Sequence, residues 1–160
     1  MGYCIVGYDK SGEGEDQYIN IDGWHQLRSI ARLYGWKPQG TTLDVWTHKT
    51  NGEKHYSFRP SEYSDDDGEW GPAPDWDGSY DSNDGQEISE SDAANLAQAL
   101  ERLLADLPYN KELCERQSKR LNDGQREKLR GWLISWSDPR GIEVITNMIA
   151  VLKRGDCRIL

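Results

Sequence analysis

The chain has 160 residues, a formal net charge of −9 and 36% hydrophobic residues, with seven Trp and eight Tyr but a single Phe. This length fits one domain with a single core, which we expect to be rich in aromatic rings. The acidic balance argues against binding to a nucleic-acid backbone, no apolar run is long enough to span a membrane, and the start does not look like a signal peptide, so we expect a cytoplasmic protein.

The N-terminal third predicts a hairpin followed by a helix. The β-rich runs Gly2–Tyr8 and Gln17–Ile21 flank a turn region rich in Gly and acidic residues. Apolar residues then recur at helical spacing from Trp24 to Tyr34, and Gly35 stands where a left-handed glycine often ends a helix.

A second hairpin is predicted around Asn51-Gly52, a strong hairpin signal. A two-residue loop would place His48 opposite His55, near enough to hold Zn²⁺ or Ni²⁺ together. His25 lies on a separate helix and no cysteine is close, so a metal site here would be incomplete, and we interpret the pair as two solvent-facing histidines. The same pairing predicts one buried face, made by Val45, Thr47, Tyr56 and Phe58.

The next segment is strongly acidic. Twelve Asp and Glu residues and no Lys or Arg lie between Glu62 and Asp92. Its Gly, Pro and Asp content predicts a mostly irregular chain at about residues 60–88. It is interpreted as a solvated cover over the core, as a docking surface for a basic protein, or as a weak calcium site without an EF-hand pattern. The candidate partner-binding residues are Asp65, Asp66, Asp67, Glu69, Trp70, Asp75, Trp76 and Asp77.

The C-terminal half predicts helices with clear local start signals. Ser89, with Asp92 three residues later, resembles a capping box before an apolar stripe that runs to Leu107. Asn122 and Gln125 resemble a second capping box, and Asp138-Pro139 predicts the start of another helix. The last residues, CRIL, predict a strand at a sheet edge. We therefore expect one α+β domain over residues 1–160, with a small antiparallel sheet packed against three or four helices.

Two blocks of sequence resemble a family of small uncharacterised bacterial proteins. They are GWHQLRSIARLYGWKPQGT and WDGSYDSNDGQEISESDAANLAQALE, which share with that family a Trp-led helix ending in a GW-x-P-x-GT turn, and an NDGQ turn into a Ser-capped, alanine-rich helix. The stretch between the blocks, from Leu43 to Asp75, is longer here than in that pattern. The resemblance implies a soluble bacterial protein and no particular activity.

No sequence motif predicts catalysis. The chain has no GxSxG, P-loop, HExxH or GxGxxG pattern, and Cys4, Cys114 and Cys157 form no CxxC pair. We predict no catalytic residue, no cofactor and no metal ligand. The expected function is a non-enzymatic binding or regulatory module that docks a basic protein partner, with an inhibitor-like or immunity-like role as one form of it. The alternatives are an enzyme that uses clustered carboxylates and a metal-stabilised module.

Overall fold

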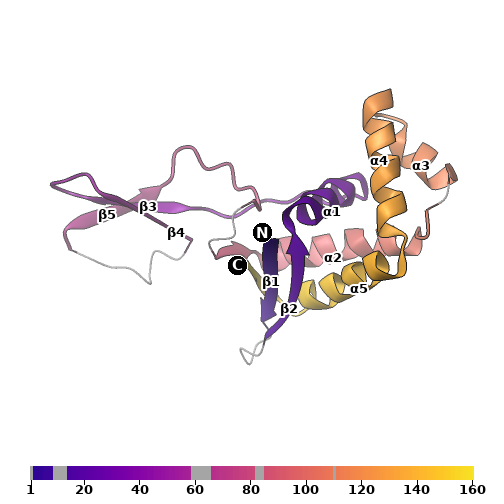
Figure 1. Cartoon of the computed structure of the whole chain (residues 1–160). Coiled ribbons are helices and arrows are strands. Elements are labelled where there is room, and N and C mark those ends of the chain that lie inside the picture. The colour runs from indigo at the N-terminus through magenta and orange to yellow at the C-terminus, as the bar shows by residue number, and fades with distance from the viewer. Residues whose placement is uncertain (1, 9–13, 59–65, 82–84, 110) are drawn as a thin grey trace.

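A computed structural model of the chain describes residues 2–8, 14–58, 66–81, 85–109 and 111–160. They form a helical body built on one antiparallel sheet, and a second sheet that projects from this body (Figure 1). The expected α+β class is confirmed. The described part of the chain has two small sheets where one was expected, and five helices where three or four were expected.

The sheet of the body has the strand order β2-β1-β7-β6, and all its neighbouring pairs are antiparallel. The predicted N-terminal hairpin is present, with Tyr3 opposite Ile19. The C-terminal strand was expected at an edge, but it lies between β1 and β6, which explains why Cys157 is fully buried. The strands are β1 (Gly2–Tyr8), β2 (Gly14–Asn20), β6 (Gln86–Ile88) and β7 (Asp156–Ile159).

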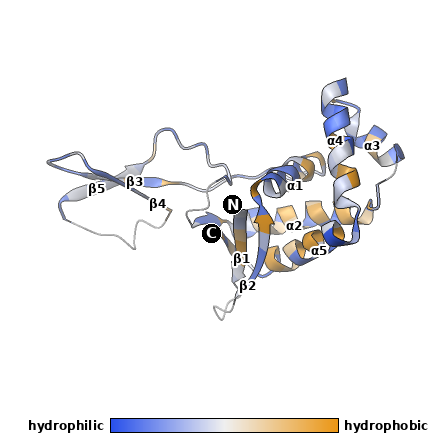
Figure 2. Ribbon diagram, viewed as in Figure 1, coloured by the Kyte–Doolittle hydropathy of each residue, from blue (hydrophilic) through white to orange (hydrophobic). Residues whose placement is uncertain are grey.

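Three helices pack on this sheet: α1 (Ile21–Leu33), α2 (Glu90–Ala105) and α5 (Pro139–Leu152). Each begins at a side chain that accepts a backbone N–H bond in the first turn, as helix starts require. These caps are Asn20, Ser89 and Asp138. The core between helices and sheet is rich in rings and branched aliphatic residues. Figure 2 shows hydrophobic residues concentrated in the body, notably on α2 and α5.

Helix α5 approaches β1 very closely at one glycine. A Cβ on Gly7 would lie 2.1 Å from the carbonyl oxygen of Val151, so only glycine fits there.

The remaining two helices, α3 (Lys111–Ser118) and α4 (Asp123–Trp136), form a helical arm on the side of the body away from the second sheet (Figure 1). The predicted capping box of Asn122 and Gln125 is confirmed, because each side chain accepts a backbone N–H bond from the other residue. Only Leu129, Leu133 and Trp136 of α4 are buried, so most of this helix faces solvent.

We call the second sheet the projecting sheet. Its strands are β3 (Asp44–His48), β4 (Lys54–Ser57) and β5 (Gly68–Pro72), in the order β4-β3-β5, and both pairs are antiparallel. Strand β5 pairs Trp70 with Trp46 of β3. Both β5 and β6 lie in the segment that was expected to be mostly irregular.

The predicted hairpin around Asn51 is present, but its pairing is shifted by two residues. Trp46, not His48, lies opposite His55, and the loop is closed by a 3.1 Å bond from the Gly52 N–H to the His48 carbonyl. The expected two-residue turn needs positive φ at both of its central residues. Gly52 has a φ of 71°, but no described residue other than glycine has a positive φ, so Asn51 does not adopt that turn.

The predicted buried face of this hairpin is wrong in part. Val45 is buried, but Tyr56 is 60% exposed. Trp46, on the opposite face, is only 2% exposed, and its indole ring lies directly over Gly68. Any side chain at Gly68 would occupy the space of that ring, so tryptophan and glycine form a matched pair across β3 and β5.

Candidate functional site

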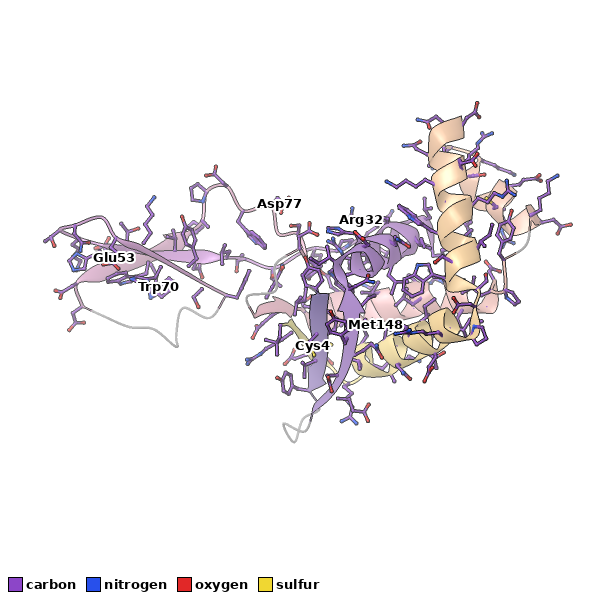
Figure 3. All side chains as sticks on the ribbon, viewed as in Figure 1. Cys4, Arg32, Glu53, Trp70, Asp77 and Met148 are labelled. Atoms are coloured by element: carbon purple, nitrogen blue, oxygen red, sulfur yellow. The ribbon has the colours of Figure 1, made fainter. Side chains whose placement is uncertain are left out.

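The predicted docking residues fall into two groups, except for Asp65, which lies outside the described residues. Four of them, Asp66, Asp67, Glu69 and Trp70, lie just before β5 or within it, on the projecting sheet. The other three, Asp75, Trp76 and Asp77, lie where the chain returns to the body. Figure 3 shows this separation through Trp70 and Asp77.

The first group is held on ordered backbone at the free end of the projecting sheet. The Lys49 backbone N–H donates to the Asp67 carbonyl at 2.7 Å, and the Lys49 ammonium donates to the Asp66 carbonyl at 3.0 Å. These bonds fix the main chain where β5 begins beside the β3–β4 turn. The side chains of Asp66, Asp67 and Glu69 are exposed there.

Aromatic rings accompany these acids. Trp70 is half-buried and pairs with the buried Trp46, while Tyr56 on β4 is largely exposed. Tyr56 was predicted to be buried, so it was not among the predicted contact residues. The alternation along β4 could not have revealed this, because the two-residue shift in pairing leaves Tyr56 on the same face of the hairpin as Val45.

The second group has a clear structural role. The Trp76 indole N–H donates to the Thr41 carbonyl at 2.6 Å, and its ring packs edge-on against Phe58 at 5.4 Å. The Asp77 carboxylate accepts the Ser79 N–H at 2.8 Å, and this bond lowers the pKa of Asp77. Both residues therefore hold the joint between the projecting sheet and the body, while Asp75 is simply exposed.

Cations of the C-terminal helices pair with other acids. Arg116 lies 3.0 Å from Asp106, Arg126 lies 3.9 Å from Asp123, and Lys153 contacts Glu101. These three acids all belong to the helical half of the chain. The negative charge of residues 66–77 is therefore not compensated by these helical cations.

The suggested histidine pair is not formed as predicted. His48 and His55 are not opposite each other; both rings pack against Trp46, at 5.6 and 5.4 Å. The Nδ1 atom of His48 accepts the N–H groups of Thr50 and Asn51, at 3.2 and 3.3 Å, so this nitrogen is used by the turn. In the part of the chain that the structure describes, no three His, Cys, Asp or Glu side chains are grouped to hold a metal ion.

A buried carboxylate, that of Asp92, connects the two chain segments that lead to the projecting sheet. Its role was not predicted from the sequence. Asp92 is 1% exposed and accepts bonds from the N–H groups of Gln39 and Gly40, at 3.0 and 2.9 Å, and from the Tyr80 hydroxyl at 2.5 Å. Ser89 accepts the Asp92 N–H as predicted, but the Asp92 side chain bonds to these distant groups and does not complete a capping box.

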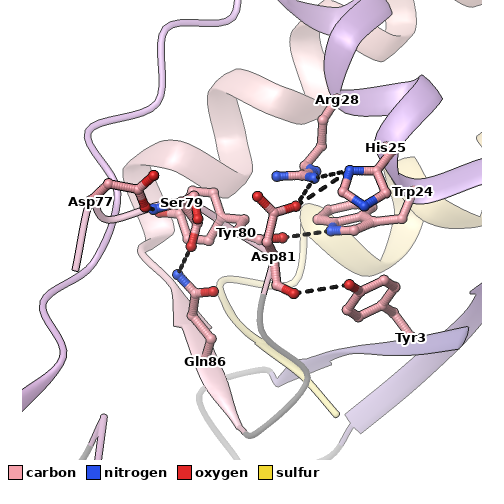
Figure 4. Close-up of polar contacts among 9 residues, drawn as sticks. All are labelled: Tyr3, Trp24, His25, Arg28, Asp77, Ser79, Tyr80, Asp81 and Gln86. Atoms are coloured by element: carbon pink, nitrogen blue, oxygen red, sulfur yellow. Dashed lines mark hydrogen bonds and ion pairs between the residues drawn. The ribbon is translucent and has the colours of Figure 1, made fainter. Parts of the chain in front are cut away.

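The same region joins the two sequence blocks that carry the family resemblance. Trp36 stacks on Tyr80 with ring centres 6.1 Å apart, and the Gln86 amide donates to the Thr41 hydroxyl at 3.0 Å. Figure 4 shows the second bond of this amide, to the Ser79 carbonyl at 2.5 Å. Burial, together with the Asp92 bond, raises the pKa of Tyr80. The motif residues therefore build a structural junction between α1, α2 and the end of the acidic segment.

A polar cluster anchors the next residues to α1. The Arg28 guanidinium contacts the Asp81 carboxylate and the Nδ1 atom of His25, the latter at 2.7 Å (Figure 4). The Trp24 indole N–H donates to the Tyr80 carbonyl at 2.7 Å, and the Tyr3 hydroxyl to the Asp81 carbonyl at 2.9 Å. Arg28 is 6% exposed, and its Nε atom has no hydrogen-bond partner among the residues described.

A surface cavity of about 540 Å³ lies elsewhere, between the β2–α1 junction and the α4–α5 turn. Tyr18, Gln26, Asp138 and Arg140 are among its lining residues, and none of the predicted docking residues lines it. No helix in the described ranges is long and apolar enough to cross a membrane.

Comparison with known proteins identified no relatives: no protein-family model, curated protein or solved structure matches the chain. The family resemblance of the two sequence blocks therefore stays a prediction. The two blocks do contact each other: Asp92 accepts the N–H groups of Gln39 and Gly40, Gln86 bonds to Thr41, and Tyr80 stacks on Trp36.

Proposed function

We propose that this chain is a non-enzymatic binding or regulatory protein that docks a basic protein partner through its projecting sheet. The observation that carries the proposal is the placement of Asp66, Asp67 and Glu69, which are exposed at one end of the molecule, away from the helical arm (Figure 1). The contact surface would include Trp70 and extend to Asp75, Trp76 and Asp77 at the joint.

Electrostatics and ring contact supply the physical basis. Exposed carboxylates accelerate the encounter with a basic surface, and tryptophan and tyrosine are frequent among the few residues that carry most of the binding energy of an interface. Tyr56 and Trp70 provide such rings beside the acids. An inhibitor-like or immunity-like role would use an acidic surface of this kind.

The test is affinity capture from a bacterial lysate at low and high salt. A variant with Asp66→Asn, Asp67→Asn and Glu69→Gln removes three charges from the projecting sheet. We expect the wild type to retain a basic protein at low salt and to lose it at high salt, because salt screens exposed charges. The variant should not retain it at either salt concentration.

A matched control removes three charges elsewhere. Glu112, Glu127 and Glu143 are exposed on α3, α4 and α5, and their change to Gln alters the net charge by the same amount. This control should capture the partner as well as the wild type does. Equal capture by the projecting-sheet variant and the wild type would refute the proposal.

The two alternative functions make different predictions. An enzyme that uses clustered carboxylates needs them to converge in a cleft. The acids of residues 66–77 instead lie on the projecting sheet or at the joint, and none of them lines the 540 Å³ cavity. A metal-stabilised module predicts that Ca²⁺ or Zn²⁺ raises the melting temperature. A rise with either ion would favour that alternative over docking.

A further inference from the structure

The cavity between the β2–α1 junction and the α4–α5 turn has the size of a small-molecule site. Its volume of about 540 Å³ falls within the range of pockets that hold small ligands. Residues of β2, α1, α4 and α5 line it. Apolar surface comes from Ile19, Trp136 and Val144, which are buried or half-buried. The remaining lining is mostly polar, so the cavity suits a ligand that combines polar groups with a smaller apolar part.

Two opposite charges line this cavity without pairing. Asp22 lies in the first turn of α1 and Arg140 in the first turn of α5, and both are exposed. Neither side chain has an ion-pair or hydrogen-bond partner in the part of the chain that the structure describes. A carboxylate and a guanidinium in one cavity therefore remain available to the opposite charges of a ligand.

Helix stability does not explain the presence of Arg140. It is the second residue of α5, and a positive charge is unfavourable near the start of a helix, where the helix dipole is positive. The neighbouring Asp138 does have a structural role, because its Oδ1 atom accepts the Gly141 N–H at 2.7 Å and caps the helix. An anionic group of a ligand beside Arg140 would offset the unfavourable interaction of its charge with the helix.

The side chain of Gln26 adds hydrogen-bond donors to the same cavity. Its Oε1 atom accepts the Trp136 indole N–H at 3.2 Å. The indole nitrogen can only donate, so this bond fixes which end of the amide faces Trp136. The NH2 group of Gln26 then has no hydrogen-bond partner among the described residues, and it is suited to a ligand oxygen.

We propose that this cavity binds a small zwitterion with one carboxylate and one ammonium group, of the free amino-acid class. The ligand carboxylate pairs with Arg140 and accepts a bond from the Gln26 amide, while the ligand ammonium pairs with Asp22. The apolar part of the ligand contacts Trp136 and Val144. Charge-assisted hydrogen bonds of this kind are stronger than bonds between neutral groups. None of the predicted docking residues lines the cavity, so this inference is independent of the proposed function.

Thermal denaturation of the full chain tests the inference first. The probes are the standard L-amino acids, together with β-alanine and γ-aminobutyrate, in which the two charges are farther apart. A ligand that binds only the folded state raises the melting temperature, and we expect such a rise with at least one of these probes. Isothermal titration calorimetry then measures the affinity of the best probe. No rise with any of them would overturn the inference.

Blocked forms of the best probe show whether both charges are recognised. The amide form lacks the carboxylate, and the N-acetyl form lacks the ammonium group. Each loses a hydrogen-bonded charge pair, so each should bind at least about tenfold more weakly than the free probe. A blocked form that binds as tightly as the free probe would overturn the inference.

Two variants assign the charges to residues. Arg140→Gln should bind the free and amide forms equally, and Asp22→Asn should bind the free and N-acetyl forms equally. Both positions are exposed, so the melting temperature without ligand should stay close to that of the wild type. Arg32→Gln and Glu143→Gln, at exposed positions outside the cavity lining, are the matched controls and should bind like the wild type. An Arg140→Gln variant that still discriminates against the amide form, or an Asp22→Asn variant that still discriminates against the N-acetyl form, would overturn the inference.

Discussion

The Tyr80 hydroxyl donates a 2.5 Å hydrogen bond to the Asp92 carboxylate, and this bond ties the end of the acidic segment to the first turn of α2. Two backbone N–H groups, of Gln39 and Gly40, complete the surroundings of that carboxylate. The charge is buried but fully bonded, which is the condition under which a buried carboxylate is tolerated. The junction therefore fixes both chain segments that lead to the projecting sheet.

Substitutions at Tyr80 or Asp92 should lower the free energy of unfolding. Asp92→Asn places an amide against N–H donors, and we expect a loss of about 3 kcal/mol in the free energy of unfolding. Tyr80→Phe removes one bond to a charged group and should cost about 2 kcal/mol. Urea unfolding followed by circular dichroism measures both. Tyr18→Phe, at a side chain 59% exposed, is the control and should change stability by less than about 0.5 kcal/mol.

Stability should fall at alkaline pH. Burial, with a smaller contribution from Asp106, raises the pKa of Tyr34 above its usual value, and burial with the Asp92 bond does so for Tyr80. The unfolded state releases these two hydroxyl protons near pH 10, while the folded state keeps them. The contribution of the two tyrosines to the free energy of unfolding is therefore complete below about pH 10 and is lost progressively above it. Urea titrations from roughly pH 8 to 11 should show this decline. A Tyr34→Phe/Tyr80→Phe variant with an equally steep decline would contradict the assignment.

The cysteines should react slowly in the folded protein. Burial, with a smaller effect of Asp156, raises the pKa of Cys157 to about 12, and burial with the nearby Asp16 carboxylate raises the pKa of Cys4. The thiolate is the reactive form, so alkylation near neutral pH should be much slower than for a free thiol, and slowest at the fully buried Cys157. Mass spectrometry after timed iodoacetamide treatment measures this order. The urea-unfolded protein, with all three thiols alkylated quickly, is the control.

The helices could be predicted from sequence because their signals are local. Asn122 with Gln125, and Asp138 before Pro139, mark helix starts through contacts three residues apart, and the structure contains both. The first hairpin was predicted from composition in the same way, although its second strand is Gly14–Asn20 rather than Gln17–Ile21, and Ile21 begins α1. The place of the C-terminal strand was not predicted, because it depends on pairing with β1 and β6, which are distant in sequence.

Only the acidic and aromatic composition of the candidate site could be predicted from the sequence, not its position in the fold. The exposure of Asp66 and Glu69 follows from their chemistry, but their position on a projecting sheet depends on the pairing of β5 with β3. The burial of Trp46 likewise depends on Gly68, a residue more than twenty positions away. The role of Asp92 was missed because its partners come from two other segments, and no local pattern marks them.

Gly68 offers a way to disturb the projecting sheet alone. A Cβ at this position would lie 1.8 Å from the Trp46 indole, so Gly68→Ala must displace that ring from its buried place. Gly71, in the same strand, has no atom within 4 Å of its Cβ position, so Gly71→Ala is the matched control. We expect Gly68→Ala to shift the tryptophan fluorescence and to abolish salt-sensitive capture of the basic partner, while the helical circular dichroism signal stays intact. Gly71→Ala should change none of these, and normal capture by Gly68→Ala would show that docking does not depend on the order of this sheet.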